Sequence, residues 1–142
     1  MAIPALKVLV VDDYEPWRSF ESSMLQTLTE FLVIGEVSDG LEAVEKAQEL
    51  QPDLILLDCG LPILNGIEAA KRIRQVSPNS KIIFVTQNND RGVRSAALAT
   101  GAEGYLIKAN AATELLPAVQ AALRDHSLIT TASAAQAEAH RA

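Results

Sequence analysis

Cysteine is nearly absent from the sequence, whose only thiol among 142 residues is Cys59. A single cysteine cannot form an intramolecular disulfide, and without a second thiol nearby a zinc site is not expected. These absences indicate a protein of the reducing cytoplasm. Because neighbouring side chains on a strand point to opposite sides, we expect the Cys59 thiol to face away from Asp58, into the packed core.

Positive charge is scarce as well. Lys and Arg together number 12 against 18 Asp and Glu, which gives a net charge of −6. Binding to nucleic-acid phosphates needs clustered Lys and Arg, so direct nucleic-acid binding by this chain is not expected. The basic residues Lys71, Arg72 and Arg74 are interpreted as a solvated helix face.

Long apolar runs are missing too. No apolar stretch approaches the roughly 20 residues that span a bilayer, and the N-terminus lacks a signal-peptide pattern, so we expect no membrane association. Apolar residues nevertheless make up 49% of the chain and charged residues 21%, which is typical of a folded globular domain. The length suits one domain, predicted at residues 1–126, followed by a tail or linker at 127–142.

Short apolar runs alternate with amphipathic segments along that domain. The apolar runs are too short for helices and predict buried strands at residues 6–11, 32–37, 54–57, 82–85 and 105–107. Helical spacing of apolar residues predicts helices at 16–29, 41–50, 67–76, 91–100 and about 112–124. Strict alternation favours parallel strands joined by right-handed crossovers, hence a doubly wound α/β sheet with helices on both faces.

Individual residues mark the ends of these helices. Pro16 suits a first helical turn, Asp39 can cap the second helix, and Gly101 follows the fourth helix where a left-handed residue is favoured. Pro117 lies inside the last predicted helix, where its missing N–H predicts either a kink or a later start.

Three carboxylates lie at predicted strand ends. Asp12 and Asp13 directly follow the first strand, and Asp58 ends the third. Parallel strands open their binding crevice at their carboxyl ends, so these side chains should converge. Crowded carboxylates repel one another unless a cation neutralises them, and oxygen ligands suit Mg²⁺. A single Asp here would more often cap a loop, but three on two strands favour a metal site.

A hydroxyl and an ammonium group are predicted at the same rim, because Thr86 closes the fourth strand and Lys108 closes the fifth. Either alone is usually a cap or a solvated strand end. Together with a nucleophilic carboxylate and a bound metal, they are what phosphoryl transfer to an aspartate requires. Asp58 is then the acceptor, and Asp12 and Asp13 are placed as ligands.

These residues resemble the receiver domain of bacterial response regulators, the CheY-like family, over about residues 5–126. The resemblance rests on Val-Val-Asp-Asp at 10–13, Leu-Asp-Cys-Gly-Leu-Pro-Ile-Leu-Asn-Gly at 57–66, Thr86, and Gly-Ala-Glu-Gly-Tyr-Leu-Ile-Lys at 101–108. Residues 33–40 and 104–109 are most similar to the NarL/FixJ subfamily, whose members usually carry a C-terminal helix-turn-helix. The sequence shows no such domain after the receiver-like region.

The resemblance implies a flavodoxin-like sheet in the strand order 2-1-3-4-5 and a phosphoacceptor function. A sensor histidine kinase or phosphotransfer protein would donate a phosphoryl group to Asp58. The carboxylates of Asp13 and Asp58 and the Gly60 carbonyl would hold Mg²⁺, with Asp12 supporting it partly through water. Lys108 would pair with the phosphoryl group.

The resemblance also implies a switch. Thr86 would turn its hydroxyl onto the phosphoryl group and Tyr105 would change rotamer, which would alter an output face that contacts a downstream protein. Such receivers often form weak homodimers on phosphorylation. The alternative interpretation of Tyr105 is a core aromatic.

Two residues depart from the family pattern. Ala109 follows Lys108 where the family often has a cis proline, and because a non-proline cis bond costs ~3 kcal/mol, we expect a trans bond. Gln87 follows Thr86 at a position that is usually small, and its amide could narrow access to the phosphoryl site.

Three functions compete at this point. The first is a stand-alone phosphoacceptor switch, and the second is the receiver portion of a NarL/FixJ-type DNA-binding transcription regulator. The third is an enzyme of the haloacid dehalogenase type, which would need a second Asp two residues after the nucleophile, where this sequence has Gly60. We therefore expect no enzyme activity beyond the protein's own phosphorylation and dephosphorylation.

Overall fold

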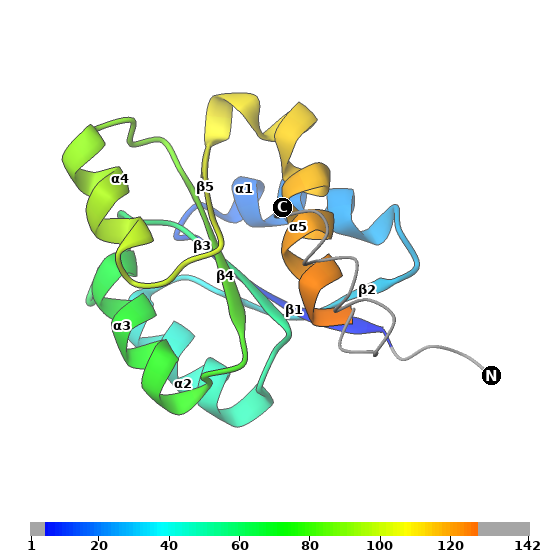
Figure 1. The fold of residues 1–142 in the computed structure, drawn as a ribbon, viewed down its shortest axis with the longest axis horizontal. Helices are drawn as coiled ribbons and strands as arrows, with labels where there is room; N and C mark the ends of the chain where they lie inside the picture. The colour runs from blue at the N-terminus through cyan, green and yellow to red at the C-terminus, as the bar shows by residue number, and fades with distance from the viewer. Residues whose placement is uncertain (1–4, 128–142) are drawn as a thin grey trace, which may run out of the picture.

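The computed structural model describes residues 5–127. A five-stranded parallel sheet forms its centre, in the order β2-β1-β3-β4-β5 (Figure 1), which confirms both the α/β class and the predicted strand order. The strands are β1 Leu6–Val11, β2 Phe31–Val37, β3 Leu54–Leu57, β4 Lys81–Thr86 and β5 Gly104–Ile107.

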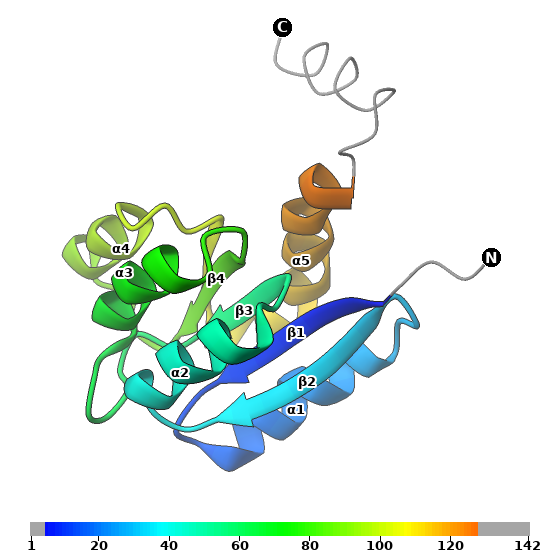
Figure 2. The same ribbon diagram turned by 90° about the horizontal axis from the view of Figure 1, so that it is seen from below.

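Helices cover both faces of the sheet (Figures 1 and 2), with α1 and α5 on one side and α2, α3 and α4 on the other. The helices are α1 Glu15–Gln26, α2 Gly40–Leu50, α3 Gly66–Val76, α4 Arg91–Leu98 and α5 Ala111–Ser127, with a 3-10 turn, η1, at Lys108–Asn110. Within residues 5–127, no helix combines the length and the apolar character needed to cross a membrane.

Alternate residues of the inner strands β1, β3 and β4 belong to two separate cores. Val8 and Val10 of β1 pack in the core under α1 and α5, whereas Leu9 and Val11 pack in the core under α2, α3 and α4. Because both faces are covered, the inner strands β1, β3 and β4 are apolar at most positions, which explains their Val, Ile and Leu runs. The prediction of a buried strand at 32–37 was wrong in part, because β2 is an edge strand in which Leu32 is 53% exposed and Glu36 is exposed.

The predicted helix starts and stops agree with the structure at three residues. Pro16 lies in the first turn of α1, Asp39 caps α2 by accepting a hydrogen bond from the Glu42 N–H at 2.7 Å, and Gly101 adopts a φ of 90° after α4. Helix α1 nevertheless ends at Gln26, not at residue 29. The prediction extended the helix too far because Leu28 continues the helical spacing of apolar residues. Leu28 packs on the core from the turn that follows the helix.

Pro117 does not delay the start of α5. The helix begins at Ala111 and continues through Pro117 to Ser127, so the alternative of a late start was wrong. Pro117 cannot donate to the carbonyl of Thr113, but both residues lie on the exposed side of the helix, where water can serve that carbonyl. Most of the predicted tail, residues 128–142, lies outside the described residues.

Two glycines allow the loop between β3 and α3 to pack closely. A Cβ added to Gly66 would lie 1.9 Å from the carbonyl oxygen of Asp58, and one added to Gly40 would lie 1.8 Å from the carbonyl oxygen of Leu64. The Gly66 N–H also donates to the Cys59 carbonyl at 2.9 Å. The loop that follows Asp58 is therefore held against α2 and α3 by backbone contacts that any side chain would block.

We predict that Gly66→Ala lowers the free energy of unfolding by about 1–3 kcal/mol, because the new methyl group overlaps the Asp58 backbone. Gly60→Ala is the matched control in the same loop, since a Cβ there meets nothing within 4 Å. Its free energy of unfolding should stay within about 0.5 kcal/mol of wild type. Urea denaturation of both variants measures the difference, and equal stabilities would contradict the packing argument.

Candidate functional site

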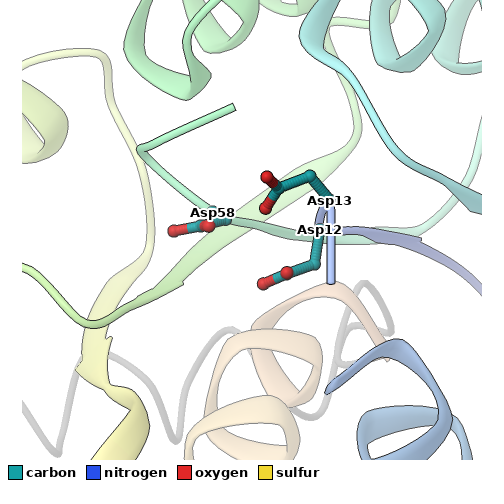
Figure 3. Close-up of side chains that lie close together, drawn as sticks. All are labelled: Asp12, Asp13 and Asp58. Carbon is teal, nitrogen blue, oxygen red and sulfur yellow. The ribbon is translucent and has the colours of Figure 1, made fainter. Parts of the chain in front are cut away.

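Three carboxylates converge at the carboxyl edge of the sheet (Figure 3). Asp12 and Asp13 follow β1 and Asp58 follows β3, and one carboxylate oxygen from each lies within 4.8 Å of the others. The backbone fixes them, because the Asp58 N–H donates to the Val11 carbonyl at 3.2 Å and the Asp12 N–H to the Val37 carbonyl at 3.1 Å. Hydrogen bonds at the strand ends thus bring together acids that are 46 positions apart in the sequence.

Lys108 brings a positive charge to this cluster. Its Nζ lies 2.6 Å from Asp12 Oδ2 and 3.8 Å from Asp58 Oδ2, and only 12% of the side chain is exposed. The ammonium therefore lies between the two buried carboxylates, as the first residue of η1 directly after β5.

One ammonium does not balance three carboxylates. Burial raises the pKa of Asp12, and the negative charge of Asp58 adds to the rise, while the hydrogen bonds from Lys108 and the Tyr14 N–H oppose it. The cluster has excess negative charge and oxygen ligands on an open side, since Asp13 is exposed. This donor set fits a hard divalent cation.

An open cleft lies above the cluster. Its lining includes most of the predicted site residues, namely Asp13, Asp58, Gly60, Thr86, Gln87 and Lys108. Asp12 is not part of the lining, because it is almost fully buried beneath the cleft. Tyr105 does not reach the cleft either.

Tyr105 is buried, with 8% of its surface exposed. Its hydroxyl donates to the Asn88 carbonyl at 2.6 Å, and the guanidinium of Arg94 lies 5.7 Å from the ring centroid. Burial raises the pKa of Tyr105, with the neighbouring Cys59 adding to the rise, so the hydroxyl keeps the proton that it donates.

Asn88 links Tyr105 to the cleft, a role that the sequence alone did not indicate. Its N–H donates to Thr86 Oγ1 at 3.3 Å, while its carbonyl accepts from Tyr105. Thr86 and Tyr105 are therefore joined through a single residue of the loop between β4 and α4. No local signal marks Asn88 in the sequence, because its partners are supplied by β4 and β5.

The prediction of a solvated basic face on α3 is confirmed for Lys71 and Arg72, which are exposed. It was wrong for Arg74, which donates to the Ser80 and Gly101 carbonyls and pairs with Glu103 at 3.2 Å.

The remaining predictions concern Cys59 and Ala109. Cys59 is buried in the core under α2, α3 and α4, as predicted, but it also borders the cleft next to Asp58. Burial raises the pKa of its thiol to about 11, with the charge of Asp58 contributing, so the thiol stays protonated. The bond between Lys108 and Ala109 is trans, as expected, since residues 5–127 contain no cis peptide.

Helix α1 contributes residues that the sequence reasoning missed. Arg18 Nη1 donates to the Asp12 carbonyl at 2.7 Å, and Lys108 Nζ lies 5.1 Å from the Trp17 ring centroid. Glu21, one turn beyond Trp17, is 1% exposed. A Glu at a core-facing position of a predicted helix could have marked this residue in the sequence, because Glu is almost never fully buried without a partner.

The sheet order and the acidic cluster at its carboxyl edge define a CheY-like α/β protein. The chain belongs to the response regulator receiver family: the family described as Response regulator receiver domain matches residues 8–120. It is therefore a receiver domain of two-component signal transduction.

Similarity to individual proteins agrees with this assignment. The chain is 35% identical over 123 residues to the response regulator protein VraR of Staphylococcus saprophyticus, covering 87% of this chain and 59% of VraR. It is 38% identical over 114 residues to the transcriptional regulatory protein LnrK of Bacillus subtilis, covering 80% of this chain and 52% of LnrK. The chain thus spans little more than half the length of these relatives.

A solved structure is similar as well. The receiver domain of the sensor histidine kinase PA1611 from Pseudomonas aeruginosa, with a magnesium ion coordinated in its active site cleft, has a TM-score of 0.75 and 32% sequence identity. The match covers 84% of this chain and 98% of that chain.

We predict that the buried Glu21 makes stability fall as pH rises. Burial raises its pKa from 4.5 to about 8, while the Trp17 indole opposes the rise. Between these values the folded protein holds a proton that the unfolded chain has lost, so the free energy of unfolding declines by at most about 1.4 kcal/mol per pH unit. Glu21→Gln removes this titration.

Urea denaturation between pH 5 and pH 8 measures the effect. The quantity compared is the free energy of unfolding of Glu21→Gln minus that of wild type. This difference should increase with pH in favour of the variant. Glu45→Gln, which removes an exposed carboxyl of α2, is the control and should show no such increase. A constant difference for Glu21→Gln would contradict the prediction.

Proposed function

We propose that Asp58 is the phosphoacceptor of this receiver. The observation that carries the proposal is the position of its carboxylate, which lines the cleft with Thr86 and lies 3.8 Å from the Lys108 ammonium. An Asp58 oxygen attacks the phosphorus of a phosphohistidine, an O–P bond forms and the P–N bond breaks. The imidazole leaves and takes up a proton, and Asp58 carries the phosphoryl group as an acyl phosphate.

Mg²⁺ is the proposed cofactor. The carboxylates of Asp13 and Asp58 and the Gly60 carbonyl would hold it, with Asp12 supporting them, and the excess negative charge of the cluster favours a divalent cation there. When bound, the ion neutralises the charge of the phosphoryl oxygens. The PA1611 receiver domain has a magnesium ion in its active site cleft, which supports the proposal by similarity.

Lys108 and Thr86 are proposed to serve the phosphoryl group after transfer. The ammonium of Lys108 pairs with a phosphoryl oxygen, and the Thr86 hydroxyl donates to another. The turn of Thr86 toward the phosphoryl group moves its Oγ1 away from the Asn88 N–H. Because the Asn88 carbonyl accepts from Tyr105, this change reaches the Tyr105 ring. Thr86 and Tyr105 are in this way the proposed switch pair.

According to this proposal, the chain is a switch and not an enzyme with a separate substrate. Its partners are a sensor histidine kinase or phosphotransfer protein and an output protein, in the cytoplasm, with weak homodimerisation on phosphorylation. Residues 1–126 form the receiver and 127–142 a tail or linker. The alternative is the receiver portion of a NarL/FixJ-type regulator, which the similarity to the transcriptional regulatory protein LnrK favours.

We predict that acetyl phosphate and Mg²⁺ add the mass of one phosphoryl group to the wild-type protein, because the cleft is open to a small phosphodonor. Intact-mass spectrometry measures the gain. Asp58→Asn should show none, whereas Asp39→Asn, which keeps the helix cap of α2 outside the acidic cluster, should gain as wild type does. A gain that persists in Asp58→Asn would exclude Asp58 as the acceptor.

We predict that Mg²⁺ stabilises the folded protein through the acidic cluster. At a concentration 100 times its Kd, a ligand that binds only the folded state adds about 2.7 kcal/mol, so the Tm of wild type should rise with Mg²⁺. Asp13→Asn should lose most of this rise, and without Mg²⁺ it should be at least as stable as wild type, because it removes one of three repelling charges. Differential scanning calorimetry with and without Mg²⁺ separates the two effects, and an undiminished rise in Asp13→Asn would contradict the assignment.

A further inference from the structure

We propose that Trp17 is a positioning residue for Lys108, holding its ammonium between Asp12 and Asp58 in the orientation that phosphoryl transfer needs. This inference rests on the proposed function of Asp58. It concerns α1, an element that supplies none of the acids, the hydroxyl or the ammonium of the site.

The contact between the two side chains has the geometry of a cation–π interaction. Lys108 Nζ lies 5.1 Å from the Trp17 ring centroid, inside the roughly 6 Å limit for such pairs, and Trp provides the strongest attraction of the aromatic side chains. The ring is contributed by the first turn of α1 and the ammonium by η1, so the contact joins two elements that both border the acidic cluster.

Lys108 needs such a partner because its own contacts are unequal. It lies 2.6 Å from Asp12 but 3.8 Å from Asp58, and its four-carbon stem is flexible. An ammonium that turned fully onto Asp12, or outward into water, would leave the phosphoryl group on Asp58 without its cation. The indole occupies one side of the ammonium, so it restricts these movements and keeps water away.

The indole is itself fixed by its neighbours on α1. Its ring centroid lies 4.8 Å from that of Phe20, with the rings tilted by 38°. Glu21, which follows one turn later on the same face, is buried. Phe20 thus supports the indole from α1, while the ring lies under the Lys108 ammonium.

The first measurement is independent of phosphorylation. In protein labelled with ¹³C-lysine, the ε-methylene protons of Lys108 should resonate upfield of those of the other lysines, because they are next to the ammonium that lies over the indole ring. Lys108→Arg assigns the signal. The upfield shift should disappear in Trp17→Leu and persist in part in Trp17→Phe, which keeps a smaller aromatic face.

The second measurement is the rate of phosphorylation by acetyl phosphate. Trp17→Leu should slow it roughly three- to thirtyfold, the range that the loss of a cation–π contact allows, and Trp17→Phe should recover part of the rate. In a Lys108→Met background, Trp17→Leu should cause no further loss, because the group that it positions is gone. Circular dichroism verifies that each variant is folded.

Two results would overturn the inference: a Lys108 signal without the ring-current shift in wild type, or an equal slowing by Trp17→Leu with and without Lys108. A merely structural Trp17 would give the second result. A wild-type protein that gains no phosphate would overturn the proposed function of Asp58, and the ring-current shift would then decide by itself whether Trp17 holds Lys108.

Discussion

Three carboxylates meet at the carboxyl ends of β1 and β3, with the single ammonium of Lys108 between two of them. In water these acids would repel one another only weakly, but Asp12 and Asp58 are buried, where charges interact more strongly. The fold tolerates this arrangement because hydrogen bonds at the strand ends and the Lys108 ion pairs oppose the repulsion. The negative charge that remains unbalanced explains why this edge suits a divalent cation.

The sheet supplies the rigidity that this arrangement requires. Apolar side chains on both faces of β1 and β3 hold the strand ends in place, and Gly66 allows the next loop to close against the Asp58 backbone. Main-chain movement in the proposed switch should therefore occur outside β1 and β3. The loop between β4 and α4 is the candidate, since Asn88 is bonded to Thr86 on one side and to Tyr105 on the other.

Helix α1 contributes to the site through contacts with Asp12 and Lys108. Arg18 binds the Asp12 carbonyl, and Trp17 lies over Lys108, so two neighbouring residues of one helix act on an acid and on its counter-ion. The buried Glu21 lies behind them at a position where an apolar residue would suit the core better. Its persistence as a neutral acid near pH 7 follows from burial, which favours the protonated form.

The sequence by itself determined the α/β class, the approximate elements and the strand-end positions of Asp12, Asp13, Asp58, Thr86 and Lys108, because apolar periodicity and parallel strands leave few alternatives. The strand order came from the resemblance to receiver domains and not from periodicity. Only the tertiary structure decided that Tyr105 is buried, that Asn88 joins it to Thr86, and that Trp17 faces Lys108. Those contacts join residues from different elements, and their geometry depends on how helices and loops pack on the sheet, which local sequence patterns do not encode.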